Sequence, residues 1–68
     1  MNIRQNMEKF LEGQIAKHEI NASVFLNNPV GVAEHPGTME TLEQELGMIA
    51  EYRDKLAALQ TLNQYDGG

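Results

Sequence analysis

The sequence predicts an all-α protein, an antiparallel two-helix hairpin that dimerises into a four-helix bundle. Two long segments carry apolar residues at the three- and four-residue spacing of an amphipathic helix. Between them, the stretch NNPVGVAEHPG holds both prolines of the chain and two of its six glycines, residue types that favour turns. At 68 residues without a cysteine, the chain forms one small domain with no disulfide or thiolate metal site. Two helices joined by a short connection must lie antiparallel if their apolar stripes are to meet.

The first segment predicts a helix over about residues 3–27. Its apolar stripe recurs mainly at every fourth position: Ile3, Met7, Leu11, Ile15, Ala22 and Phe25. His18 fills the gap in this stripe, and we expect it at the edge of the core with a hydrogen-bond partner. The helix should end near Asn27, because Pro29 disfavours the α conformation at Asn28 and asparagine tolerates the left-handed backbone that ends helices.

The connection, at about residues 28–36, is longer than most connections in helical bundles. Val30 and Val32 predict a structured turn in which the two valines cover the end of the core. The alternative is a metal or acid–base site, since histidine and carboxylate are ligand types for zinc and iron. That site would combine Glu34 and His35 with His18 and Glu19. His18 lies well below the loop, and the bundle-metal spacings Glu-x-x-His and His-Glu-x-x-His do not occur, so we predict no metal, no cofactor and no catalytic residue.

The second segment predicts a helix over about residues 37–64, followed by a frayed tail at 65–68, so that the whole chain is a single helical-hairpin domain. Its apolar spacing is close to a heptad pattern, which favours pairing of helices. Arg53 falls beside this pattern, and we expect it to pair with an acid such as Glu19 across the hairpin. The candidate interface residues are Leu42, Leu46, Ile49, Leu56 and Leu59, and Leu62 extends the same stripe.

Composition excludes several classes of function. The formal net charge of −5 and the lack of a basic patch argue against direct nucleic-acid binding. No apolar run approaches the roughly 18 residues of a membrane span, and the amino-terminal residues lack the apolar stretch of a signal peptide. These features predict a cytoplasmic protein. Because the two apolar stripes exceed what one hairpin can bury, we expect a homodimer.

The sequences NNPVGVAEHP and LEQELGMIAEYRDKLAALQTL, within about Asn27 to Leu62, resemble small uncharacterised proteins of T4-like marine cyanophages and of ocean metagenomes. The resemblance implies a phage or marine-microbial origin and expression inside a bacterial host, and it implies no activity and no catalytic residues. We therefore expect a non-enzymatic protein–protein interaction module, a phage-encoded modulator of a host or viral protein. The alternative is a small structural component of a virion or another assembly.

Overall fold

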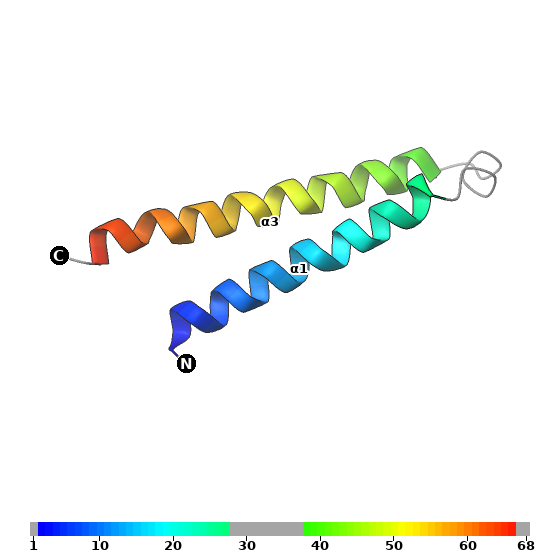
Figure 1. Ribbon diagram of the computed structural model, residues 1–68. Helices are drawn as coiled ribbons and strands as arrows, with labels where there is room; N and C mark the ends of the chain where they lie inside the picture. The colour runs from blue at the N-terminus through cyan, green and yellow to red at the C-terminus, as the bar shows by residue number, and fades with distance from the viewer. Residues whose placement is uncertain (1, 28–37, 67–68) are drawn as a thin grey trace.

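The computed structural model describes residues 2–27 and 38–66, with side chains described up to residue 62. These residues form two helices, α1 (Ile3–Leu26) and α3 (Thr38–Asp66), and no strand. The helices lie against each other in opposite directions, so that both chain ends are on the same side of the molecule (Figure 1). The prediction of an all-α fold built from two packed helices is confirmed. The predicted turn at 28–36 lies outside the described residues.

The start of α1 is fixed by a pair of reciprocal hydrogen bonds. The backbone N–H of Gln5 donates to Oδ1 of Asn2 at 2.8 Å, and the backbone N–H of Asn2 donates to Oε1 of Gln5 at 3.0 Å. This is a capping box, which satisfies backbone donors that the helix itself leaves without partners. At the other end, the backbone N–H of Asn27 donates to the carbonyl of Ser23.

Residues that face the opposite helix alternate at spacings of three and four along both helices. This is the heptad spacing of a coiled coil, which keeps one line of side chains on the partner as the helix turns. In α1 the line is Arg4, Glu8, Leu11, Ile15, His18, Ala22 and Phe25, all buried or half-buried. In α3 it is Thr38, Leu42, Glu45, Ile49, Tyr52, Leu56 and Leu59. We call these two lines together the seam; Gln14, Asn21 and Met48 flank it and are half-buried.

The seam differs from the apolar stripes predicted from the sequence in both helices, because some residues of each stripe are exposed. Ile3 is 84% exposed and Met7 is 45% exposed, because each four-residue step advances about 40° beyond one full turn and a stripe of such steps winds away from the partner helix. In α3, Leu46 and Leu62 are more than half exposed. The seam position that the sequence stripe gave to Leu46 belongs to Glu45.

The two helices lie closest beside the connection and diverge toward the chain ends (Figure 1). The seam residues at the close end include Ala22 and Thr38, both buried and both small. Toward the open end the seam includes the longer side chains of Arg4 and Leu59. Neither helix combines the length and the hydrophobicity that a bilayer crossing requires.

Candidate functional site: a polar cluster in the seam

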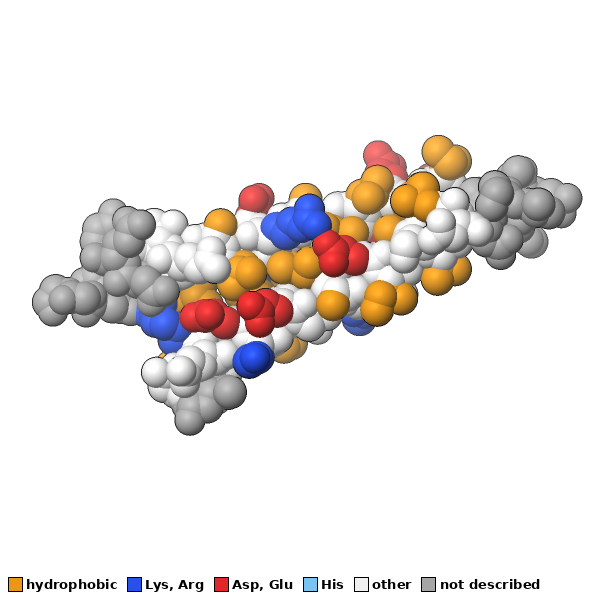
Figure 2. Space-filling model, in the orientation of Figure 1, with side chains coloured by type: hydrophobic (Ala, Val, Ile, Leu, Met, Phe, Trp, Pro, Cys, Tyr) orange, Lys and Arg blue, Asp and Glu red, His pale blue; other side chains and the backbone are white. Residues whose placement is uncertain are grey.

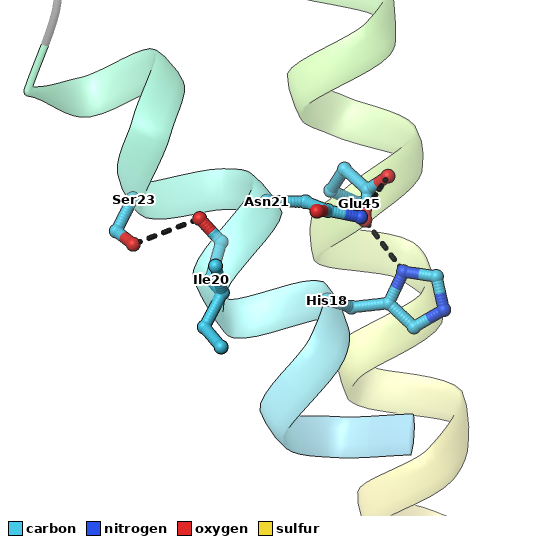
Figure 3. Close-up of polar contacts among 5 residues, drawn as sticks. All are labelled: His18, Ile20, Asn21, Ser23 and Glu45. Atoms are coloured by element: carbon cyan, nitrogen blue, oxygen red, sulfur yellow. Dashed lines mark hydrogen bonds and ion pairs between the residues drawn. The ribbon is translucent and has the colours of Figure 1, made fainter. Parts of the chain in front are cut away.

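A histidine and a glutamate meet in the middle of the hydrophobic seam. His18, on α1, is 8% exposed, and its Nδ1 lies 2.5 Å from Oε2 of Glu45 on α3 (Figure 3). An ionised carboxylate can only accept hydrogen bonds, so the shared proton belongs to Nδ1 of the imidazole. The contact therefore fixes the tautomer of His18 as well as the relative position of the helices.

Asn21 supplies a second donor to the same carboxylate. Its Nδ2 lies 3.3 Å from Oε1 and 3.4 Å from Oε2 of Glu45. His18 and Asn21 are three residues apart and so lie on neighbouring turns of one helix face, both directed at Glu45 (Figure 3). Among the described side chains, no buried polar atom lacks a hydrogen-bond partner. The carboxylate is thus accommodated in the seam by two donors from α1.

The electrostatic effect of this arrangement falls on Glu45. The hydrogen bond from His18 lowers the pKa of the Glu45 carboxyl below its usual value, and the Asn21 amide and the nearby Lys17 act in the same direction. Partial burial opposes them by disfavouring the charged form. Stabilisation of the carboxylate by donors prevails, so Glu45 is an anion at neutral pH.

An aromatic ring extends the cluster along α3. The rings of His18 and Tyr52 are stacked, with centroids 5.9 Å apart and planes inclined by 13°. On the same helix, Nζ of Lys55 lies 4.9 Å from the centroid of the Tyr52 ring, a cation–π distance. His18 is consequently held by Glu45 through one ring nitrogen and by Tyr52 through its face.

Two further contacts connect the helices on either side of this cluster. Arg53 pairs with Glu19, as the sequence predicted, although both side chains are about half exposed. Near the open end, Nη1 of Arg4 donates to the backbone carbonyl of Leu59 at 3.2 Å. These contacts and the His18–Glu45 pair fix the register of α1 on α3 at three places along its length.

The geometry of the cluster, as far as the described residues show, favours neither a metal site nor an activated serine. His18 and Glu45 are metal-ligand types, but no three His, Asp or Glu side chains converge within the described parts of the chain. The hydroxyl of Ser23 donates to the carbonyl of Ile20 in its own helix at 2.9 Å and is not directed at the imidazole (Figure 3). The geometry is that of a cross-link between two helices.

The candidate residues predicted from the sequence lie partly in the seam, partly on the surface and partly outside the described residues. His18 has the hydrogen-bond partner expected of it, so that prediction is confirmed. Ile49 is buried, and Leu42, Leu56 and Leu59 are half-buried in the seam, whereas Leu46 is on the surface. The four loop residues lie outside the described chain: Val30, Val32, Glu34 and His35.

Sequence reasoning did not find Glu45 or Asn21. Glu45 stands three residues after Leu42 and four before Ile49, so the heptad spacing of its apolar neighbours places it in the seam. A glutamate at such a position needs a polar partner on the opposite helix. His18 is the residue of α1 that supplies it.

The second notable surface is apolar. Within the described chain only three hydrophobic residues are buried, while nine large hydrophobic side chains are exposed by 45 to 84%. Figure 2 shows hydrophobic side chains on both helices next to the connection, with an acidic group among them, and further hydrophobic side chains along the middle of the molecule. The exposed residues are Ile3, Met7, Phe10, Ile20, Val24, Leu26, Met39, Leu46 and Leu62.

The elongated shape explains this exposure. The radius of gyration is 15.8 Å, whereas a compact chain of this length has a value of about 11 Å. The accessible surface is 5108 Å², against roughly 4,300 Å² for a globular protein of the same mass. Two helices cannot enclose a core, so apolar side chains on their outer sides have nothing to pack against.

Comparison of the chain with protein-family models, with curated proteins and with solved structures finds no match.

Proposed function

We propose that this chain is a non-enzymatic helical interaction module that works as a homodimer and binds a second protein in that form. The observation that supports the proposal is the excess of exposed over buried hydrophobic side chains, nine against three in the described residues. Large exposed apolar patches on a small protein mark interaction sites. The polar cluster at His18 contributes by fixing the hairpin that presents this surface.

The extra accessible surface of the elongated hairpin is similar in size to one partner's share of a protein–protein interface. The accessible surface exceeds that of a globular chain by about 800 Å², an amount similar to what each partner contributes to an interface of standard size. A second copy that covers this area would supply the apolar burial that one hairpin lacks. Folding and association would then be coupled, as in many small homodimers.

The charge of α3 points to the chemistry of the second partner. Its described acidic side chains are Glu40, Glu43, Glu45, Glu51 and Asp54, against only two bases, Arg53 and Lys55. A basic surface on another protein is the complementary partner. With the resemblance to cyanophage proteins, we propose a host or viral protein in the cytoplasm of an infected bacterium.

Sedimentation equilibrium across nanomolar to micromolar concentrations tests self-association. We expect a dimer at micromolar concentration and a melting temperature that rises with protein concentration. Ile49→Asp should dissociate and unfold the chain together, because it places an unpaired charge in the seam. A stable, cooperatively folded monomer at micromolar concentration would contradict the proposal.

Replacement of Glu40, Glu43 and Glu51 by glutamine tests the second partner. All three side chains are exposed, so the variant should fold and dimerise like the native chain. It should fail to retain the basic host or viral protein that the native chain retains from an infected-cell lysate. Equal retention by both chains would contradict the role of α3.

A second candidate function is a structural component of a virion or another assembly. Exposed apolar residues occur on both helices, including Ile3 near the open end and Leu26 and Met39 near the connection. Surfaces so separated could contact two different neighbours and extend into an open array. Sedimentation velocity distinguishes the two functions, since a closed dimer reaches a constant mass whereas an open array grows with concentration.

A further inference from the structure

One side of α1 carries most of the exposed apolar surface of that helix. Ile3, Phe10 and Val24 are separated by multiples of seven residues and therefore lie along one line, with Met7 and Ile20 on its two flanks. At about 100° per residue, this line lies roughly a third of a turn away from the seam. We call this side the α1 stripe; its central residues are Ile3, Asn6, Phe10, Gly13, Gln14, Lys17, Asn21 and Val24.

Charges on α1 are segregated with respect to this stripe. The three glutamates of the helix, Glu8, Glu12 and Glu19, lie on the opposite side of it, where Glu19 reaches Arg53. The stripe itself contains no acidic side chain and one base, Lys17. A surface of this kind can approach a copy of itself without repulsion between carboxylates, provided that the two lysines do not meet.

We propose that two copies of the chain pair through their α1 stripes, antiparallel, about a two-fold axis between residues 13 and 14. The inference rests on the proposed self-association and assigns it to one surface. In an antiparallel pair about this axis, each residue of one copy faces the residue of the other copy for which the two residue numbers add up to 27. The facing pairs are Ile3 with Val24, Asn6 with Asn21, Phe10 with Lys17, and Gly13 with Gln14.

Three of these pairs are chemically complementary. Ile3 and Val24 are both apolar and both more than half exposed in the single chain. Asn21 directs its amide nitrogen to Glu45, which leaves its carbonyl oxygen to accept a hydrogen bond from Asn6 of the second copy. At the Phe10 pair, a lysine meets an aromatic ring.

The antiparallel arrangement is favoured by the position of Lys17. Parallel pairing would set Lys17 of one copy against Lys17 of the other, whereas the two-fold arrangement sets each lysine against Phe10. At the axis, the space outside Gly13 is open, with nothing within 4 Å of where a Cβ would lie. A second helix can therefore approach closely at its midpoint.

The other exposed apolar group is a weaker surface for a second copy. It comprises Leu26, Met39 and Leu46, and it is interrupted by Glu43 and Arg53 on the same side of α3. A stripe along all of α1 is about 36 Å long, which can bury the area that a stable dimer needs. The smaller group is left for the second partner.

Two serine variants matched in exposure test the assignment. Phe10 is 53% exposed and Leu46 is 52% exposed, so each substitution removes a similar area from the surface of the folded hairpin. Phe10→Ser should raise the dissociation constant of the dimer at least about tenfold, since it removes two central aromatic rings per dimer. Leu46→Ser should change it less than about threefold.

Directed disulfides test the orientation, because the native chain has no cysteine. An equimolar mixture of Ile3→Cys and Val24→Cys chains should oxidise mainly to the mixed dimer, whereas each variant alone should cross-link poorly. Circular dichroism of each variant shows whether it retains the helices before the measurement is made.

The possible results separate the inference from the proposed function. A dimer that Leu46→Ser disrupts and Phe10→Ser does not would overturn the α1 stripe while leaving the homodimer intact. Preferential cross-linking of Ile3→Cys to itself would overturn the antiparallel arrangement. A native chain that is monomeric at micromolar concentration would overturn both.

Discussion

His18 and Glu45 are 27 residues apart in sequence, yet Nδ1 of the histidine lies 2.5 Å from Oε2 of the glutamate. Both residues occupy seam positions that apolar residues fill in most of the neighbouring turns. A polar pair at such positions disfavours any register in which either residue faces an apolar side chain. We infer that the pair selects one alignment of the two helices.

Removal of the imidazole should weaken the hairpin. His18→Ala eliminates a ring that is 8% exposed and stacked on Tyr52, and it leaves the Glu45 carboxylate without its closest donor. We expect a loss of about 1–3 kcal/mol in the free energy of unfolding, measured by urea denaturation. Lys9→Ala, which changes an exposed residue of the same helix outside both the seam and the α1 stripe, should cost less than about 0.5 kcal/mol. Equal effects of the two substitutions would show that the cluster has no special role.

Stability should fall at acidic pH in a way that depends on Glu45. Its pKa is lowered in the folded chain, chiefly by the hydrogen bond from His18, so the unfolded chain binds a proton at Glu45 more readily than the folded chain does. The stabilisation is complete above the ordinary glutamate pKa, about 4.3, and is lost as pH falls through the lowered value. Melting curves from pH 6 to pH 3 should show a steeper decline for the native chain than for Glu45→Gln. Parallel curves would contradict the assignment.

The ion pair between Glu19 and Arg53 should contribute little. Both side chains are about half exposed, and such pairs are screened by water and salt. A double-mutant cycle with Glu19→Ala and Arg53→Ala should give a coupling energy of about 0.2–1 kcal/mol, which decreases in high salt. A larger, salt-independent coupling would mean that the pair is buried in solution, as it would be if a second chain covered this side of the hairpin.

The fold class could be predicted from the sequence because periodicity is a local property of each helix. Apolar spacing and the turn residues between the segments predict the two helices, and an antiparallel placement of the segments predicts the Glu19–Arg53 pair. The phase of the seam was harder to predict. Leu46 is more hydrophobic than Glu45, and the sequence stripe places it in the seam. Glu45 occupies the seam instead, because alternating steps of three and four residues keep one line of α3 side chains facing α1 along the whole helix.

The polar cluster depends on a contact that neither segment reveals alone. The sequence indicates that His18 needs a partner, but only the alignment of the two helices shows that Glu45 is that partner and that Asn21 binds the same carboxylate. The capping box at Asn2 and Gln5 was not predicted, although its Asn-x-x-Gln spacing is visible in the sequence. Helix ends signalled by adjacent residues are thus predictable, whereas interhelical pairs require the register.

Alanine at the two helical glycines should give different results if α1 stripes pair. Nothing lies within 4 Å of a Cβ built at Gly13 or at Gly47, so in an isolated hairpin each substitution should stabilise its helix by up to about 1 kcal/mol. Gly47 lies on α3, away from the α1 stripe, and Gly47→Ala should give this gain at every protein concentration. Gly13 lies beside the proposed two-fold axis, where an added methyl group would meet Gln14 of the second copy. The gain from Gly13→Ala should therefore appear at concentrations where the chain is monomeric and shrink or reverse where it is dimeric. Thermal unfolding at several concentrations measures both, and an equal, concentration-independent gain at the two sites would place the interface elsewhere.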